Sequence, residues 1–156
     1  MKASDWEASV PEAIKQDVLW KTTAYRRGLF AADIGWKDVE KLFKDGRTRS
    51  LADQLYRSLG SISANITEGY SRNSGRDRAR FFEYALGSAR EARDWYYKAR
   101  HILDDAVVQH RIDLLTEIIK LLTVTVQAER NRSLREETFE YEAATDPQKY
   151  SIHDTR

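Results

Sequence analysis

Apolar residues recur with a period near 3.6 along four stretches of the chain, and no stretch keeps the strict alternation typical of β-strands. The predicted helices cover residues 15–34, 50–69, 76–105 and 107–135, with a short additional helix over 36–44. Gly35 is expected to interrupt the first helix, and Asp45-Gly46 is a turn signal before the second. Amphipathic helices joined by short turns predict an all-α fold, an up-down-up-down four-helix bundle.

One face of each predicted helix is expected to join a single core. The residues expected to be buried together are Leu55, Ile62, Ile66, Phe82, Ala89, Ile118 and Leu122. The inward stripe of the first helix is expected to include Val18, and the short helix over 36–44 is expected to turn Val39, Leu42 and Phe43 inward. Repeated alanines in the third helix indicate close helix packing.

The length of 156 residues suits one domain. The bundle is expected over residues 16–135, after an N-terminal extension over 1–15. Residues 136–156 form an acidic tail that we expect to be mobile, because the apolar periodicity is lost there. No secretory signal and no transmembrane span is visible in the sequence, so we expect a cytoplasmic protein without a membrane role.

Charge is distributed unevenly although the net charge is only +1. Residues 47–101 hold eleven Lys/Arg against six Asp/Glu, and most of this excess is arginine. Such a patch attracts phosphate groups, although a solvated helix surface held by ion pairs has the same composition. The candidate RNA-binding residues are Arg72, Arg76, Arg78, Arg80, Arg90 and Arg93.

Signatures of catalysis are missing from the sequence. None of the three histidines has a glutamate three residues before it, as di-iron bundles require, and no H-E-x-x-H pattern occurs. Phosphate-binding glycine loops and a serine nucleophile elbow are also absent, and the chain has no cysteine. We therefore expect a protein that is not an enzyme, with no catalytic residues, no metal and no cofactor.

The most specific stretch lies between residues 58 and 91 and contains S-I-S-A-N-I-T-E-G, a basic loop, and R-F-F-E-Y-A-L-G-S-A-R-E. It resembles the motif of the bacterial 23S rRNA-intervening sequence proteins, S-I-P-x-N-I-A-E-G followed by R-F-L-x-x-A-x-G-S-x-x-E. The matching positions include Ser61, Ile62, Asn65, Glu68, Gly69, Phe81, Gly87, Ser88 and Glu91. Two positions depart from the motif, because Ser63 replaces its proline and Thr67 its alanine. Loss of the proline predicts a straighter second helix.

This resemblance implies a four-helix bundle without enzymatic activity. Known members of the family form ring-shaped pentamers. A related accessory protein of diversity-generating retroelements binds a reverse transcriptase and nucleic acid through a basic surface. The resemblance thus implies a homopentamer, with RNA and a reverse transcriptase or another RNA-handling protein as candidate partners.

The end of the second helix leaves three interpretations open. Glu68 lies near the helix C-terminus, where a carboxylate needs a compensating cation such as a nearby arginine. Gly69 is placed for the left-handed residue that ends many helices. The polar residues of the motif can form a lock between the second and third helices, a recognition site for RNA or a partner chain, or, with Glu68, a catalytic site.

Some positions suggest a surface that contacts another subunit. Gly60 and Ala64 lie opposite the apolar stripe of the second helix, where small side chains permit close approach. Leu86 and Tyr97 flank the core face of the third helix. These four residues are the predicted oligomer interface, and repeated head-to-tail contacts between identical subunits usually close into a ring.

Two functional hypotheses follow. In the first, a homo-oligomeric bundle binds RNA or an RNA-handling protein through its arginine-rich helices, with Tyr70, Phe81 and Tyr97 as candidates for base stacking. In the second, the chain is a structural or assembly protein with a protein partner and no role with nucleic acid. The weak net charge does not separate them.

Overall fold

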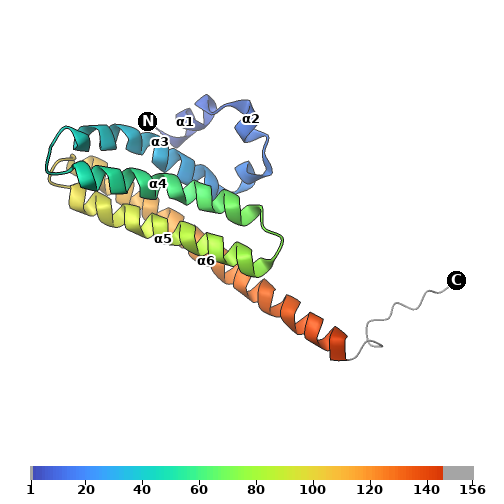
Figure 1. Ribbon diagram of the computed structural model, residues 1–156. Coiled ribbons are helices and arrows are strands. Elements are labelled where there is room, and N and C mark those ends of the chain that lie inside the picture. The colour runs from blue at the N-terminus through green and yellow to red at the C-terminus, as the bar shows by residue number, and fades with distance from the viewer. Residues whose placement is uncertain (1, 146–156) are drawn as a thin grey trace.

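The computed structural model describes residues 2–145, and the side chains of residue 136 and of residues 139–145 lie outside the description. Its four long helices are α3 (Thr23–Phe43), α4 (Arg49–Tyr70), α5 (Gly75–Ala99) and α6 (Asp105–Thr145). Each packs against the next, and α3 also packs against α6, so the helices form an all-α bundle (Figure 1). In the described part of the chain, none of the helices is long and apolar enough to cross a membrane.

The core confirms the predicted burial. All seven residues expected to share it are buried in one cluster, with exposed fractions between 0 and 6%. The alanines of α5 make this packing possible, since Ala85, Ala89, Ala92 and Ala99 are all completely buried. Such small side chains let α4 and α6 approach the backbone of α5 closely on both sides.

The beginning of the chain differs from the prediction. A long helix does not start near residue 15; instead α1 (Ala3–Ser9), α2 (Glu12–Lys15) and the 3₁₀ turn η1 (Val18–Lys21) precede α3. Asp17 caps η1 by accepting a hydrogen bond of 2.8 Å from the Leu19 amide, which favours a break at this point. Val18, predicted to face inward, is consequently exposed.

This N-terminal segment packs on the bundle. The indole of Trp6 is buried, with its ring centroid 5.3 Å from that of Phe30 on α3 and 6.1 Å from that of Trp20. The extension predicted over residues 1–15 therefore contributes a side chain to the main core cluster.

The helix expected to break at Gly35 runs through it without interruption. A β-carbon at this position would lie 2.5 Å from Cδ1 of Leu59 and 3.1 Å from the Tyr96 hydroxyl. Gly35 therefore permits close packing of α3 against α4 and α5 and does not stop the helix. With α3 continuous, Val39 and Leu42 are buried as predicted, whereas Phe43 is exposed and its predicted inward orientation is wrong.

The ends of α5 and α6 also differ from the predicted ends. Helix α5 stops at Ala99, six residues before the predicted end, and α6 continues to Thr145, ten residues past residue 135. The first part of the predicted mobile tail is thus helical, and the last turns of α6 project beyond the rest of the bundle (Figure 1). The remainder of that tail, 146–156, lies outside the described residues.

Candidate nucleic-acid interface

The basic segment lies where the loop after α4 leads into α5, at the end of the bundle from which α6 projects (Figure 1). Ser74 begins α5 by accepting a hydrogen bond of 3.1 Å from the Asp77 amide, and its hydroxyl donates to the Asp77 carboxylate. The first two turns of α5 then carry Arg76 and Arg80 on one face, one turn apart, and Arg78 on another.

Two of the six candidate arginines have carboxylate partners. Arg72 pairs with Glu68 one turn earlier and lies 4.6 Å from the centre of the Phe81 ring. Arg78 turns toward α6, where its Nε lies 3.2 Å from a Glu129 carboxylate oxygen. A phosphate would have to compete with these carboxylates, so neither arginine is a strong anion site.

Arg76 and Arg80 are exposed and line one hollow of about 660 Å³ between α5 and α6. Among the described residues, neither forms an ion pair with a carboxylate. Arg80 donates instead to the Tyr84 hydroxyl at 2.7 Å, and this hydrogen bond raises the pKa of the guanidinium further above its ordinary value. Arg80 therefore remains cationic across the physiological range.

Acidic side chains also line this hollow, but two are already engaged. Glu83 pairs with Arg130 of α6 at 2.6 Å, and Asp77 is held by the cap of α5. Glu137 is the third carboxylate of the lining. The arrangement leaves the two α5 arginines as the cations best placed to receive an anion.

Arg90 and Arg93 lie farther along α5. Fourteen residues separate Arg76 from Arg90, which corresponds to about 21 Å of helix. Arg93 donates to the Thr116 hydroxyl on α6 at 3.2 Å, whereas Arg90 is exposed, and both line a small hollow with Tyr97. The six candidate arginines therefore do not form one patch.

The polar residues of the family motif mostly bond within their own helices. The Asn65 amide donates to the Ser61 carbonyl at 2.8 Å, and the Ser88 hydroxyl donates to the Tyr84 carbonyl at 2.9 Å. Glu91 accepts from the indole of Trp95, one turn later in α5. With Glu68 also paired one turn away, none of these interactions is the predicted lock between the second and third helices.

Gly69 corrects a prediction. It lies inside α4, and no glycine in the described residues has a positive φ angle. A β-carbon there would lie 3.1 Å from Cβ of Phe81 and 3.2 Å from the Phe82 ring. Glycine at this position lets α5 pass close by, and it does not end the helix in a left-handed residue.

The predicted interface residues occupy different places. Gly60 and Ala64 are exposed, and a β-carbon on Gly60 would meet nothing within 4 Å. Tyr97 is also exposed, on the α6 side of α5. Leu86, predicted to flank the core, is only 8% exposed and belongs to the core cluster, in which α5 packs against both α4 and α6.

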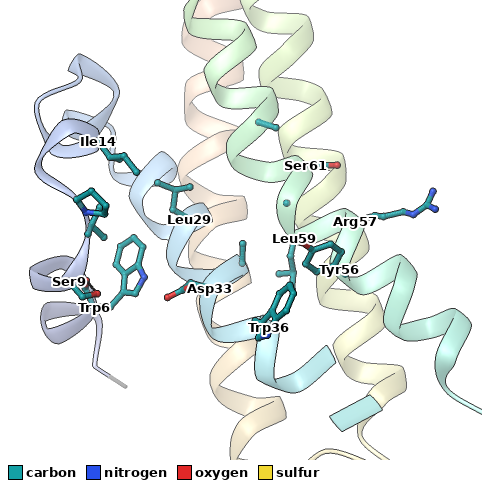
Figure 2. Close-up of a pocket in the computed structure, with 15 residues that line it drawn as sticks. Trp6, Ser9, Ile14, Leu29, Asp33, Trp36, Tyr56, Arg57, Leu59 and Ser61 are labelled. Atoms are coloured by element: carbon teal, nitrogen blue, oxygen red, sulfur yellow. Dashed lines mark hydrogen bonds between the residues drawn. The ribbon is translucent and has the colours of Figure 1, made fainter. Parts of the chain in front are cut away.

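Gly60 and Ala64 form part of an apolar groove of about 850 Å³ (Figure 2). One wall comes from the N-terminal segment with Ile14, and the other from α3 and α4. Trp36 and Tyr56 meet edge to face in this groove, with ring centroids 5.7 Å apart and exposed fractions of 60 and 48%. The sequence pattern did not identify these two aromatic residues as a surface cluster.

A buried polar cluster was likewise not predicted from the sequence. The Asp38 carboxylate of α3 accepts hydrogen bonds from Nε of Arg111 at 2.8 Å and from the Tyr96 hydroxyl at 2.9 Å. Burial, followed by the Asp38 charge, raises the pKa of Tyr96 far above its ordinary value. The sequence held one signal for this cluster: Asp38 lies four residues after Ile34 and four before Leu42, so a carboxylate occupies the apolar face of the helix.

Groups of acidic and histidine side chains suited to a metal are absent from the part of the chain that the structure describes. No curated protein matches the sequence. One solved structure, a protein of unknown function from the S23 ribosomal protein family of Bacteroides thetaiotaomicron, is 24% identical. It covers 67% of this chain and 98% of its own, with a TM-score of 0.63, and it shows the same fold.

The model of the family described as 23S rRNA-intervening sequence protein matches residues 23–136. This range begins at the first residue of α3 and ends inside α6, so it contains the bundle but neither the N-terminal segment nor the last turns of α6. The motif between residues 61 and 91 lies within it. The chain belongs to the 23S rRNA-intervening sequence protein family.

Proposed function

We propose that this protein is a non-catalytic, homo-oligomeric binding module that holds RNA through the hollow between α5 and α6. Arg76 and Arg80 carry this proposal, because both are exposed in one hollow without a carboxylate partner among the described residues. Guanidinium groups match phosphate geometry and stay charged at all physiological pH values. An RNA-handling protein, such as a reverse transcriptase, is a further partner compatible with the same surface.

Replacing both arginines, Arg76→Ala with Arg80→Ala, should weaken RNA binding to a similar extent for unrelated sequences. Phosphate contacts carry no sequence information, and removing one of them lowers the slope of log affinity against log salt by about 0.7–0.9. The double variant should therefore have a slope that is smaller by about 1.4–1.8. Fluorescence anisotropy with labelled RNA over about 50–200 mM salt measures both quantities.

The matched control is Lys44→Ala with Arg49→Ala, which removes the same charge from exposed positions that line neither the hollow nor the apolar groove. This variant should retain a salt slope close to that of the unchanged protein. The proposal fails if the unchanged protein does not retain RNA even at the lowest salt concentration. Equal losses in both double variants would instead indicate attraction by overall charge, without a site on α5.

The oligomeric part of the proposal has support from two surfaces at different places on the bundle. One is the apolar groove at α3 and α4 with Gly60 and Ala64. The other is the small hollow with Arg90 and Tyr97, farther along α5 than the proposed RNA site. A head-to-tail ring needs two such surfaces on every subunit, one for each neighbour. The exposed Trp36 and Tyr56 in the groove are suited to contact with another subunit.

Light scattering should give a mass near five times 18.1 kDa for the unchanged protein, whereas Gly60→Trp should shift it toward the monomer. Gly46→Trp is the control, since Gly46 is likewise exposed with open space around it, in the turn between α3 and α4 and outside the lining of both surfaces. Circular dichroism should show similar helix content in both variants. A mass of about 18.1 kDa for the unchanged protein at micromolar concentration would contradict the ring.

A structural protein with only protein partners is the second candidate function. The same apolar groove favours it, because its exposed aromatic residues suit protein contacts better than phosphate contacts. RNA retention separates the two candidates. An oligomer that retains no RNA at low salt would support the structural role.

A further inference from the structure

Aromatic rings alternate with arginines at the beginning of α5. The rings of Phe81 and Tyr84 are nearly perpendicular, with centroids 5.8 Å apart. The Arg72 guanidinium lies over Phe81, and that of Arg80 lies 5.6 Å from the centre of the Tyr84 ring. Phe81 is a stacking candidate predicted from the sequence, whereas Tyr84, which touches both Phe81 and Arg80, is identified only by these contacts.

Tyr84 lines the same hollow as Arg76 and Arg80, and 46% of its surface is exposed. Its hydroxyl accepts the hydrogen bond from Arg80, and its ring rests against Phe81, so two contacts restrain the orientation of the exposed ring. A ring held in this way loses little conformational entropy when a ligand stacks on it. The hollow thus combines two cations that suit phosphates with a restrained aromatic surface beside them.

Single-stranded and double-stranded RNA use such a surface differently. In a duplex the bases are stacked on each other, and proteins contact mainly phosphates and 2′-hydroxyl groups. Unpaired bases expose their π-faces, which stack on aromatic side chains with little dependence on sequence. A surface made only of arginines serves both forms, whereas an exposed tyrosine between arginines favours unpaired bases.

We infer that this hollow selects single-stranded over duplex RNA, with Tyr84 stacking on an unpaired base while Arg76 and Arg80 bind the adjoining phosphates. This inference rests on the proposed function and names the class of RNA that the same site takes. Tyr84 acts here as a specificity-determining residue, and the two arginines supply affinity that does not depend on base exposure.

The test compares an unstructured RNA of about 20 nucleotides with the duplex formed by the same strand and its complement, both binding the full chain at fixed salt. Tyr84→Leu keeps an apolar side chain of helix-forming type but removes the aromatic face. It should weaken single-strand binding by about 5-fold or more and leave duplex binding within about 2-fold. Its salt slope should stay that of the unchanged protein, because both phosphate-binding arginines are retained.

Tyr84→Phe is the matched control, since it keeps the ring and removes only the hydroxyl that Arg80 contacts. It should bind single-stranded RNA much more tightly than Tyr84→Leu does. Ultraviolet crosslinking followed by mass spectrometry should place a pyrimidine adduct on the peptide that contains Tyr84. Circular dichroism of all variants checks that this exposed position leaves the bundle folded.

Duplex RNA that binds as tightly as the single strand would overturn the inference, and so would equal single-strand affinities for Tyr84→Leu and the unchanged protein. If Arg76→Ala with Arg80→Ala still lowers the salt slope in that case, the phosphate site stands and only stacking is excluded. If neither RNA binds the unchanged protein, the proposed function and this inference fall together.

Discussion

An Asp38→Ala variant is expected to lose about 3–5 kcal/mol of unfolding free energy, because it removes one partner of a buried ion pair. The Asp38 carboxylate is 7% exposed and holds Arg111 of α6 and Tyr96 of α5 at the same time. Without it, a guanidinium that is 16% exposed loses its carboxylate partner, and a buried hydroxyl loses its acceptor. Urea unfolding followed by circular dichroism at one protein concentration measures the change.

Two control variants distinguish the loss of the buried ion pair from the loss of an exposed ion pair or of a single hydrogen bond. Asp53→Ala removes an exposed carboxylate that pairs with Arg57 at 3.2 Å, and it should change the unfolding free energy by about 1 kcal/mol or less. Tyr96→Phe removes one hydrogen bond and keeps the ion pair, so a loss of about 0.5–1.5 kcal/mol is expected. A result in which Asp38→Ala is no more destabilising than Asp53→Ala would show that the buried cluster contributes no stability.

A Leu55→Ala variant is expected to lose about 2–5 kcal/mol of unfolding free energy. Leu55 is fully buried in the core cluster, so the shorter side chain removes apolar packing and leaves a cavity that the surrounding helices fill only in part. The two-state denaturation curve should shift to lower urea with its slope unchanged.

Leu134→Ala makes the same chemical change at a residue that is 62% exposed on α6. It should alter the unfolding free energy by no more than about 0.5 kcal/mol. Similar losses in both leucine variants would contradict the placement of Leu55 in the core, because truncating a solvated side chain creates no cavity.

The N-terminal segment and the end of α6 are this chain's additions to the range that matches its family. The first supplies a wall of the apolar groove and buries Trp6 against Phe30. The second supplies Glu137, at one side of the hollow with the α5 arginines. Both surfaces proposed for binding therefore include residues that lie outside the family match.

The sequence by itself determined the helical bundle, the core and the family. A helix buries one face, so apolar residues three and four positions apart indicate which face lies against the core, as at Leu55, Leu59, Ile62 and Ile66. The motif between residues 61 and 91 was sufficient to identify the family, because its spacing is kept across two helices and a loop. All of this information lies in residues that are close in sequence.

Glycines show where local information ends. Gly35 and Gly69 were predicted to break or end helices. A glycine that ends a helix cannot be distinguished by sequence alone from one that permits close packing inside a helix. The structure places both inside helices, where Leu59 in one case and Phe81 in the other pack close to the glycine.

Only the tertiary structure decided which charged and aromatic residues are available. Arg78 and Arg80 are two residues apart, yet one meets Glu129 of α6 and the other remains beside Tyr84 in an open hollow. Leu86 is buried in the core cluster, and Asp38 is buried where Tyr96 of α5 and Arg111 of α6 contact it. Such pairings join residues 50 or more positions apart. They depend on the rotation and axial offset of neighbouring helices, which the periodicity of one helix does not report.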